Sequence, residues 1–215
     1  MSNFARYYPP IASLKIVVPP EGDAIDMDVL KRHLRISFED DDDDIRAYMQ
    51  AAVDMLEGDT GYLGRALLEQ TWDAFYNYFP TRDRCDSAYG SFIQLPMPPV
   101  VSVGGVFYKD GNGVEQTMPP SGYTTDLVQQ PALVFSKAWP AIGDFPAAIR
   151  VRFTAGYPVV DGDSTIPPAI ISALKLLIAD LYENREQTLV DGTATELPMG
   201  VHALLRKYRT HLGFA

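Results

Sequence analysis

The most conspicuous chemical feature of the sequence is a run of six consecutive acidic side chains: Glu39, Asp40, Asp41, Asp42, Asp43 and Asp44. Hard oxygen ligands of this kind bind calcium or magnesium. The run lacks the spaced ligands and the glycine of a calcium-binding loop, so no metal site is predicted. The carboxylates instead lie at the start of a predicted helix, where Ser37 or an aspartate caps the first turn and the helix dipole favours negative charge. In an oligomer the run has a second interpretation, as an acidic ring that lines a channel.

The cysteine and the histidines show no pattern of a metal or catalytic site. The three histidines, His33, His202 and His211, lie outside helical reach of one another and of the single cysteine, Cys85, so zinc-ligand spacing is missing. Two arginines near Cys85 favour its thiolate, but no histidine-containing signature surrounds it. No nucleophile elbow, phosphate-binding loop or dinucleotide fingerprint occurs. We therefore predict no catalytic residues, no cofactor and no enzymatic activity.

A cluster of aromatic side chains has two interpretations. Its members are Trp72, Phe75, Tyr76, Tyr78 and Phe79. Exposed together, they would form a sugar-binding platform. Aromatic residues at strand spacing are more often core and cross-strand pairs, so we expect them to belong to the core.

The C-terminal stretch is basic and has no acidic residue after Glu196. Its cations suit the end of a helix, because they complement the helix dipole. The same stretch also suits a docking tail for an acidic or grooved partner, since its last apolar residues have nothing local to pack on. Both interpretations stay open. The candidate docking residues are Leu205, Arg206, Lys207, Tyr208, Arg209, Leu212 and Phe214.

Helical periodicity is confined to the two ends of the chain. At the N-terminal end, Asp26 can cap a short helix through about Leu34, and an apolar stripe over residues 45–56 predicts a second helix that stops at Gly58. At the C-terminal end, helical spacing follows Pro167-Pro168 to about residue 185, and a last helix begins near Pro198.

Between these helices the pattern is that of a β structure. Short β-rich runs occur at residues 71–79, 92–95, 100–108, 133–135 and 149–153. Residues 109–113 (KDGNG) predict a hairpin turn, since their glycines accept positive φ, and Gly104-Gly105 indicates a bulge. We predict an α+β fold, a small bundle of about four helices with an inserted, mostly antiparallel β module. The expected domains are residues 1–64 (an extended arm and two helices), 65–160 (the β module) and 161–215 (two helices and a tail).

Composition narrows the function classes. The 215 residues have a net charge of −10, of which residues 1–64 hold −7. This balance argues against wrapping nucleic acid, which depends on Lys and Arg displacing counterions. No apolar stretch approaches the length of a membrane span, and the N-terminal residues have no secretory pattern. The single cysteine fits a reducing compartment, so we expect the protein to be made in cytoplasm.

An ordered set of fragments resembles the head–tail connector (adaptor or head-completion) proteins of tailed bacteriophages, which also occur in prophages and gene transfer agents. Each fragment is weakly specific alone, but together they span nearly the whole chain in consistent order. The fragments are residues 30–36 (LKRHLRI), 57–61 (EGDTG), 67–72 (LLEQTW), 93–103 (IQLPMPPVVSV), 151–157 (VRFTAGY), 166–170 (IPPAI), 180–186 (DLYENRE), 197–201 (LPMGV) and 205–209 (LRKYR).

This resemblance implies a structural subunit of the virion, assembled in the bacterial host cytoplasm and placed at the head–tail interface. Family members form a homo-oligomeric ring, usually twelve-fold, that binds the portal protein and extends the DNA channel towards the next connector, stopper or tail protein. DNA passes through such a ring without sequence-specific binding, during genome packaging and ejection. The resemblance also implies that residues 205–215 dock into the portal. The alternative is another virion or tail protein, such as a stopper or a receptor- or carbohydrate-binding module.

Overall fold

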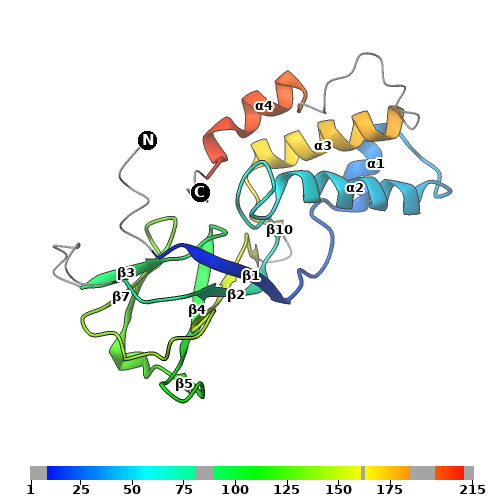
Figure 1. Cartoon of the computed structure of the whole chain (residues 1–215). Coiled ribbons are helices and arrows are strands. Elements are labelled where there is room, and N and C mark those ends of the chain that lie inside the picture. Colours follow the sequence, from blue (N-terminus) through cyan, green and yellow to red (C-terminus); the bar gives the residue numbers. More distant parts are fainter. Residues whose placement is uncertain (1–8, 81–89, 161–162, 185–196, 211–215) are drawn as a thin grey trace, which may run out of the picture. The chain divides into compact units, whose positions relative to one another are not determined.

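The computed structural model describes residues 9–80, 90–160, 163–184 and 197–210. These residues form two compact units. The helical unit comprises residues 22–68 and 157–210, and the β unit is described over residues 9–21, 69–80 and 90–156. The described residues form four α-helices, two larger antiparallel sheets and a short two-stranded ribbon (Figure 1). The predicted α+β fold class is therefore confirmed.

The helical unit contains the elements from both ends of the sequence. Its helices are α1 (Met27–Leu34), α2 (Asp42–Leu56), α3 (Pro168–Glu183) and α4 (Met199–Leu205), and the 3-10 helix η4 (Arg206–Tyr208) follows α4. The ribbon before α3 consists of β9 (Val159–Val160) and β10 (Asp163–Ser164).

Local sequence signals set the ends of these helices. The Asp26 carboxylate accepts a hydrogen bond from the Val29 amide at 3.0 Å, which caps α1 as predicted. Arg35 ends α1 in a left-handed conformation. Gly58, just after α2, has a φ of 88°, a conformation that glycine adopts without steric cost. Helix α3 starts after Pro167 and has a proline in its first turn, where this residue is tolerated.

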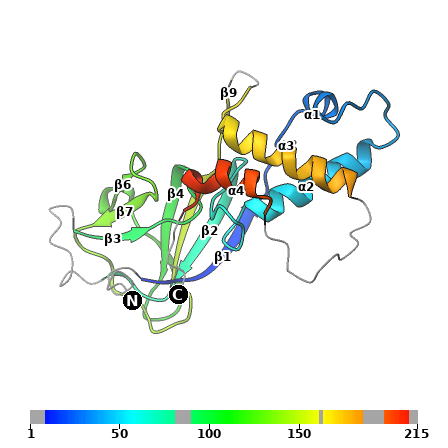
Figure 2. The same cartoon turned by 90° about the horizontal axis from the view of Figure 1, so that it is seen from above.

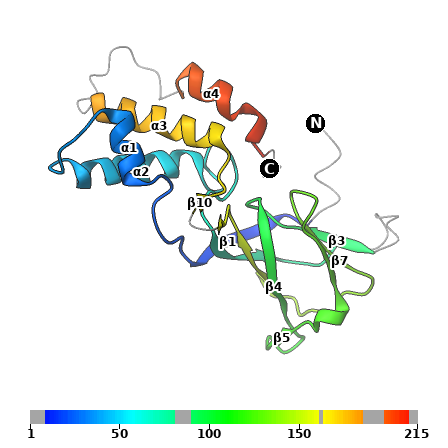
Figure 3. The same cartoon turned by 180° about the vertical axis from the view of Figure 1, so that it is seen from behind.

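Helix α3 packs against α2 and α4 and lies between them (Figures 1 and 3). The apolar stripes predicted for both ends of the chain meet in one core. Residue Leu30 from α1 and residues Val201 and Leu205 from α4 belong to the same cluster. The buried residues of the two central helices are Ile45, Met49, Ala52, Val53 and Leu56 from α2, and Ile170, Ala173, Leu174, Leu177 and Ile178 from α3.

The β unit contains a five-stranded antiparallel sheet with the strand order β1-β2-β8-β4-β5. Its strands are β1 (Ile11–Val18), β2 (Gln70–Tyr76), β8 (Ile149–Ala155), β4 (Val100–Lys109) and β5 (Glu115–Thr117). A second antiparallel sheet has the order β3-β7-β6, with β3 (Ser91–Gln94), β7 (Leu133–Ser136) and β6 (Thr124–Asp126) after the 3-10 helix η3 (Pro120–Gly122). Figure 2 shows β3, β6 and β7 gathered apart from β1, β2 and β4.

Strand alternation decides which face of the larger sheet is buried. In β8, Ile149, Val151, Phe153 and Ala155 are buried, and the residues between them are half-buried.

The Tyr76 hydroxyl of β2 donates to the Gln94 carbonyl of β3 at 2.9 Å, which joins the two sheets. Complete burial of this phenol raises the pKa of Tyr76, so it stays a neutral donor.

The predicted strands correspond to β2, β3, β4, β7 and β8. The predicted hairpin joins β4 to β5, and the predicted bulge appears as a register shift between Val103 and Gly105. The short polar strand β6 was not predicted, because it has no apolar alternation.

The N-terminal segment differs from its predicted placement. Residues 11–18 were expected in an extended arm of the domain 1–64, but they form strand β1 and pair with β2 from Ile11 opposite Tyr76 to Val18 opposite Thr71. The apolar run indicated extended backbone, but its partner lies more than fifty residues away in sequence. The two units divide the chain at residues 21 and 22, 68 and 69, and 156 and 157. The domain boundaries 64/65 and 160/161 stay a prediction from the sequence.

Candidate functional site

Two residues of the acidic run hold the helical unit together. Asp42 accepts an ion-paired hydrogen bond from the Lys31 ammonium at 2.7 Å, which ties α1 to α2. Asp41 accepts a hydrogen bond from the Tyr182 hydroxyl of α3. Asp41 occupies the N-cap position of α2 without a side-chain capping bond. The predicted side-chain cap of this helix, by Ser37 or an aspartate, is therefore wrong, and the Asp41 carboxylate bonds to Tyr182 instead.

The other four residues of the run form an exposed acidic surface at the start of α2. They are Glu39, Asp40, Asp43 and Asp44, and we call them the acidic surface. Asp43 pairs with Arg46 at 3.1 Å, but both side chains are exposed, so solvent screens the pair. Among the described residues no group of three or more histidine, cysteine, aspartate or glutamate side chains could hold a metal ion.

The candidate docking residues divide between core and surface. Leu205 is fully buried in the core of the helical unit. Arg206, Lys207 and Arg209 are exposed, and we call them the basic segment; Tyr208, between them, is half-buried. Leu212 and Phe214 lie outside the described residues. The Thr210 amide donates to the Leu63 carbonyl at 2.8 Å, so the basic segment ends in a contact with the loop that follows α2.

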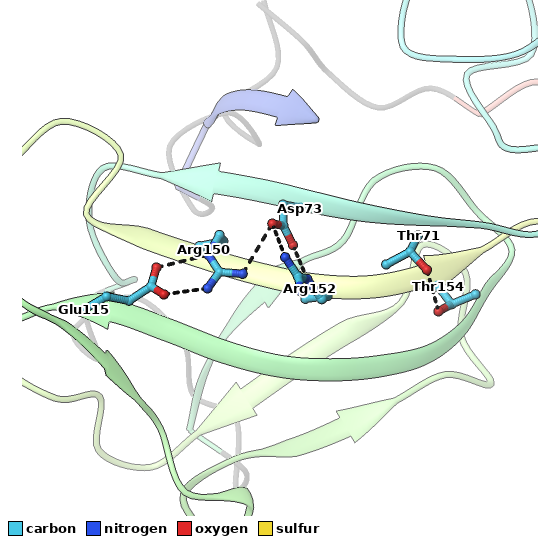
Figure 4. A network of polar contacts seen from close by, with 6 residues as sticks. All are labelled: Thr71, Asp73, Glu115, Arg150, Arg152 and Thr154. Atoms are coloured by element: carbon cyan, nitrogen blue, oxygen red, sulfur yellow. Dashed lines mark hydrogen bonds and ion pairs between the residues drawn. The ribbon is translucent and has the colours of Figure 1, made fainter. Parts of the chain in front are cut away.

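A polar network that the sequence did not predict lies on the face of the larger sheet opposite the buried residues of β8 (Figure 4). Arg152 donates to Asp73 through Nε and Nη2, both at 2.8 Å, and Arg150 donates to Asp73 at 3.3 Å. Arg150 also donates to Glu115 at 2.6 and 3.1 Å and lies 3.9 Å from the centroid of the Phe107 ring. The network joins β2, β8, β4 and β5.

Strand register explains this network. Asp73 of β2 lies opposite Arg152 of β8, and Arg150 lies opposite Phe107 of β4. Burial alone would raise the pKa of the Asp73 carboxyl, but the hydrogen bonds and charges of Arg152 and Arg150 outweigh it and hold this pKa below its ordinary value. The same hydrogen bonds raise the pKa of Arg152. All charges of the network are paired, so we assign it to the stability of the sheet.

The aromatic cluster does not form an exposed row. Trp72, Tyr76 and Phe79 are buried, Phe75 is half-buried and Tyr78 is exposed. Phe79 stacks on Trp139 with ring centroids 4.6 Å apart. These positions agree with a core role and give no platform for a sugar ring.

The remaining candidates are surface residues or lie outside the described ranges. His33 and His202 are exposed, and the Tyr62 ring contacts His202 edge-on with centroids 5.5 Å apart. Cys85 and His211 lie outside the described residues. Within the described ranges, no helix combines the length and the apolarity needed to cross a membrane.

Comparison with known proteins finds similarity among solved structures only. No protein-family model matches the chain, and no curated protein matches it. Three solved chains each cover 92% of this chain over 95% of their own length. One comes from the neck of an empty gene transfer agent (GTA) particle computed with C6 symmetry, with a TM-score of 0.65 and 25% identity. The others come from the virion of a native GTA particle (0.64, 27%) and from the neck of a native GTA particle computed with C12 symmetry (0.64, 26%).

These similarities define a class of protein. The chain has the fold of chains found in the neck of GTA particles, and the match includes both the helical unit and the β unit. More particularly, the similarity supports a structural role for this chain as a component of the neck of a phage-like virion.

Proposed function

We propose that this protein is a subunit of the head–tail connector (adaptor) ring in a tailed-phage or phage-like particle. The observation that supports this most is the similarity to GTA neck chains over 92% of this chain and 95% of theirs. A match of that extent includes the sheet as well as the helices, so it is more specific than a likeness between helical bundles. The proposed role is structural and requires no catalytic residue.

The proposed assembly is a homo-oligomeric ring, with twelve copies as in a neck of C12 symmetry. One surface of the β unit favours contacts between copies. Strand β1 is an edge of its sheet, and its last residues, Ile16, Val17 and Val18, are exposed. An exposed apolar edge strand pairs readily with another chain, so a neighbouring copy at this edge would remove the apolar surface from water.

The proposed portal contact is the basic segment together with the residues that follow it. Arg206, Lys207 and Arg209 are exposed, which leaves their charges available to an acidic partner. Leu205 belongs to the core, so docking is assigned to the residues after it. Leu212 and Phe214 stay in the proposal as apolar anchors beyond the described residues. The opposite side of the ring would bind the next connector, stopper or tail protein.

The proposed channel lining is the acidic surface, Glu39, Asp40, Asp43 and Asp44. Asp41 and Asp42 are excluded, because they bind Tyr182 and Lys31 within the subunit. Collected in many copies, the exposed carboxylates would repel DNA phosphates and let the genome slide without binding.

The assembly is tested by measuring the mass of the protein in solution with and without the purified portal, followed by imaging of particles. We expect a closed ring of this protein on the portal vertex. An image with a lone copy at the vertex, or with none, overturns the proposal.

The portal contact is tested with charge reversals matched in number. Reversal of the basic segment to glutamate, or removal of residues 211–215, is expected to abolish portal binding while the circular dichroism spectrum shows that the helices stay folded. An equal number of exposed arginines reversed elsewhere in the helical unit serves as the control and should leave binding within about twofold. Equal loss in both sets would mean that net charge, and not the docking segment, governs binding. The control arginines are Arg32, Arg35 and Arg46.

The channel lining is tested by converting the acidic surface to the corresponding amides. Ring formation should be intact, and genome ejection should slow, because each subunit loses four repelling charges. The control converts Asp54 and Asp59, two exposed aspartates elsewhere in the helical unit. Normal ejection kinetics in the first variant would remove the channel-lining role and leave the ring proposal in place.

A further inference from the structure

The basic segment is fastened to the loop that follows α2. The Thr210 amide donates to the Leu63 carbonyl at 2.8 Å. Gly64 has a φ of 63°, and a Cβ atom at this position would lie 3.1 Å from the Thr210 carbonyl oxygen. The two backbones therefore approach closely at a point directly before residues 211–215.

Arg65 joins its own loop to Tyr157 and to the segment that contains Tyr208 and Thr210. Its Nη1 donates to the Tyr157 hydroxyl at 2.6 Å, and its Nη2 donates to the Thr210 hydroxyl at 3.5 Å. Its guanidinium lies 5.9 Å from the centroid of the Tyr208 ring. Hydrogen bonds from a charged donor are stronger than those between neutral groups, and a planar guanidinium can serve several acceptors at once.

A second arginine contact runs in the opposite direction. The Arg209 guanidinium lies 5.0 Å from the centroid of the Tyr62 ring, and the same ring contacts His202 of α4. Each side of the junction thus supplies one arginine to an aromatic ring on the other side, an arrangement that stabilises both.

The loop on which the segment rests is itself held against α2. The Tyr62 amide donates to the Met55 carbonyl and the Leu63 amide to the Leu56 carbonyl, both at 3.0 Å. The Glu57 carboxylate accepts from the Leu67 amide at 2.6 Å. The support is therefore continuous with the last turn of α2, so the end of the basic segment has a fixed position in the helical unit.

We propose that Arg65, with Tyr62 and Tyr157, acts as a latch that positions the basic segment before it contacts the portal. The latch orders residues 206–210 in the free subunit, so this ordering entropy is not lost again on binding. Arg65 is a positioning residue, since it acts through the segment that it holds. The inference rests on the proposed docking role of the basic segment.

The latch is tested first in the full-length protein without any partner. Hydrogen exchange of amides 206–210 should accelerate about tenfold in Tyr157→Phe, which removes one acceptor of the Arg65 guanidinium, and further in Arg65→Met. Arg65→Lys keeps the charge and one donor group, so its exchange should be intermediate. Amides of α3 should exchange at the wild-type rate in all variants. Unchanged exchange of residues 206–210 in Tyr157→Phe and Arg65→Met would overturn the latch.

The positioning role is tested by portal binding of the same variants. Arg65→Met should raise the apparent Kd about tenfold, because only the latched fraction binds productively, and Arg65→Lys should restore part of the loss. The control is Arg46→Met, an exposed arginine of α2 whose removal should change neither exchange nor binding. If exchange accelerates while portal affinity stays within twofold, the segment does not need to be positioned. If the wild type itself fails to bind the portal, the docking function is wrong, and the exchange data alone decide whether the latch exists.

Discussion

Replacement of Asp73 by asparagine should destabilise the β unit, although it only exchanges one carboxylate oxygen for an NH2 group. The carboxylate of Asp73 accepts three hydrogen bonds from Arg150 and Arg152, at 2.8, 2.8 and 3.3 Å. An asparagine keeps one acceptor oxygen and directs an NH2 group at a guanidinium. The variant therefore loses the charge pairing of two arginines while the shape of the side chain is nearly conserved.

The magnitude follows from how far each partner can reach water. Removing one partner of a fully buried ion pair costs about 3–5 kcal/mol. The Asp73 side chain is 7% exposed, but that of Arg152 is 40% exposed and can turn towards solvent. Arg150 keeps its bidentate contact with Glu115. We therefore expect a loss of about 2 kcal/mol at neutral pH, below the range for a fully buried pair.

The pH dependence has a definite sign. The pKa of Asp73 in the folded protein lies below its ordinary value of 3.8, so the unfolded chain takes up this proton first as the pH falls. The stabilisation is fully present above the pKa of the unfolded chain and is lost as the pH falls through the folded pKa. The free-energy difference between wild type and Asp73→Asn should be constant from about pH 5 to 8 and should shrink below about pH 4.

The assay is urea unfolding followed by tryptophan fluorescence. The chain has two tryptophans, Trp72 and Trp139, and both belong to the β unit, so the signal reports this unit selectively. Glu115→Gln is the matched control, since Glu115 is 51% exposed and its loss should cost about 0.5 kcal/mol. A cost for Asp73→Asn no larger than that of Glu115→Gln, or one that stays constant down to pH 3, would refute the reasoning.

Three further variants test other parts of the fold. Tyr182→Phe removes the hydrogen bond to Asp41 and should cost the helical unit about 1 kcal/mol, measured by circular dichroism at 222 nm, which follows the helices; no change would show that water replaces the bond. Phe153→Ala should cost the β unit about 3–5 kcal/mol through the cavity that it leaves, seen as an earlier fluorescence transition in urea. Gly58→Ala should cost about 1 kcal/mol from backbone conformation alone, because open space surrounds the position; a neutral result would mean that the loop relaxes.

Much of the fold could be predicted because its signals are local. The stripe from Ile45 to Leu56 and the capping residue Asp26 each lie within one helix, and their periodicity or position determines the element. The predicted strands were found for the same reason, as was the turn between β4 and β5. Neighbouring residues determined each of these features.

The features that were missed depend on pairs that are distant in sequence. Asp73 and Arg152 are 79 residues apart, and Arg65 and Thr210 are 145 residues apart. The structure shows that Arg150 and Arg152 share the face of β8 opposite its buried residues. Their partner becomes visible only when the register of β2 against β8 is known, and nothing in the local pattern specifies it.

The acidic run shows how one composition can divide into different roles. Asp41 and Asp42 are neighbours of Asp43 and Asp44 in sequence, but a helix directs successive side chains about 100° apart. Two of the four therefore face Tyr182 and Lys31, and two face solvent. The sequence could place the run at a helix start, but the division depends on where α1 and α3 pack against that helix.

The length of α2 separates the two proposed functions within one subunit. The acidic surface lies at its first turn, and the latch lies on the loop after its last turn, so 15 residues put about 22 Å between them. At this distance, well beyond the Debye length at physiological salt, variants at the two sites should act independently. Substitution of Glu39 by glutamine and of Asp40, Asp43 and Asp44 by asparagine should leave the portal affinity unchanged. Arg65→Met should change genome ejection only through the number of rings bound to portals. In a variant that combines the changes at both sites, the change in the free energy of portal binding should equal the sum of the two separate changes. A difference of more than about 0.5 kcal/mol would show that the acidic surface belongs to the portal contact and not to the channel.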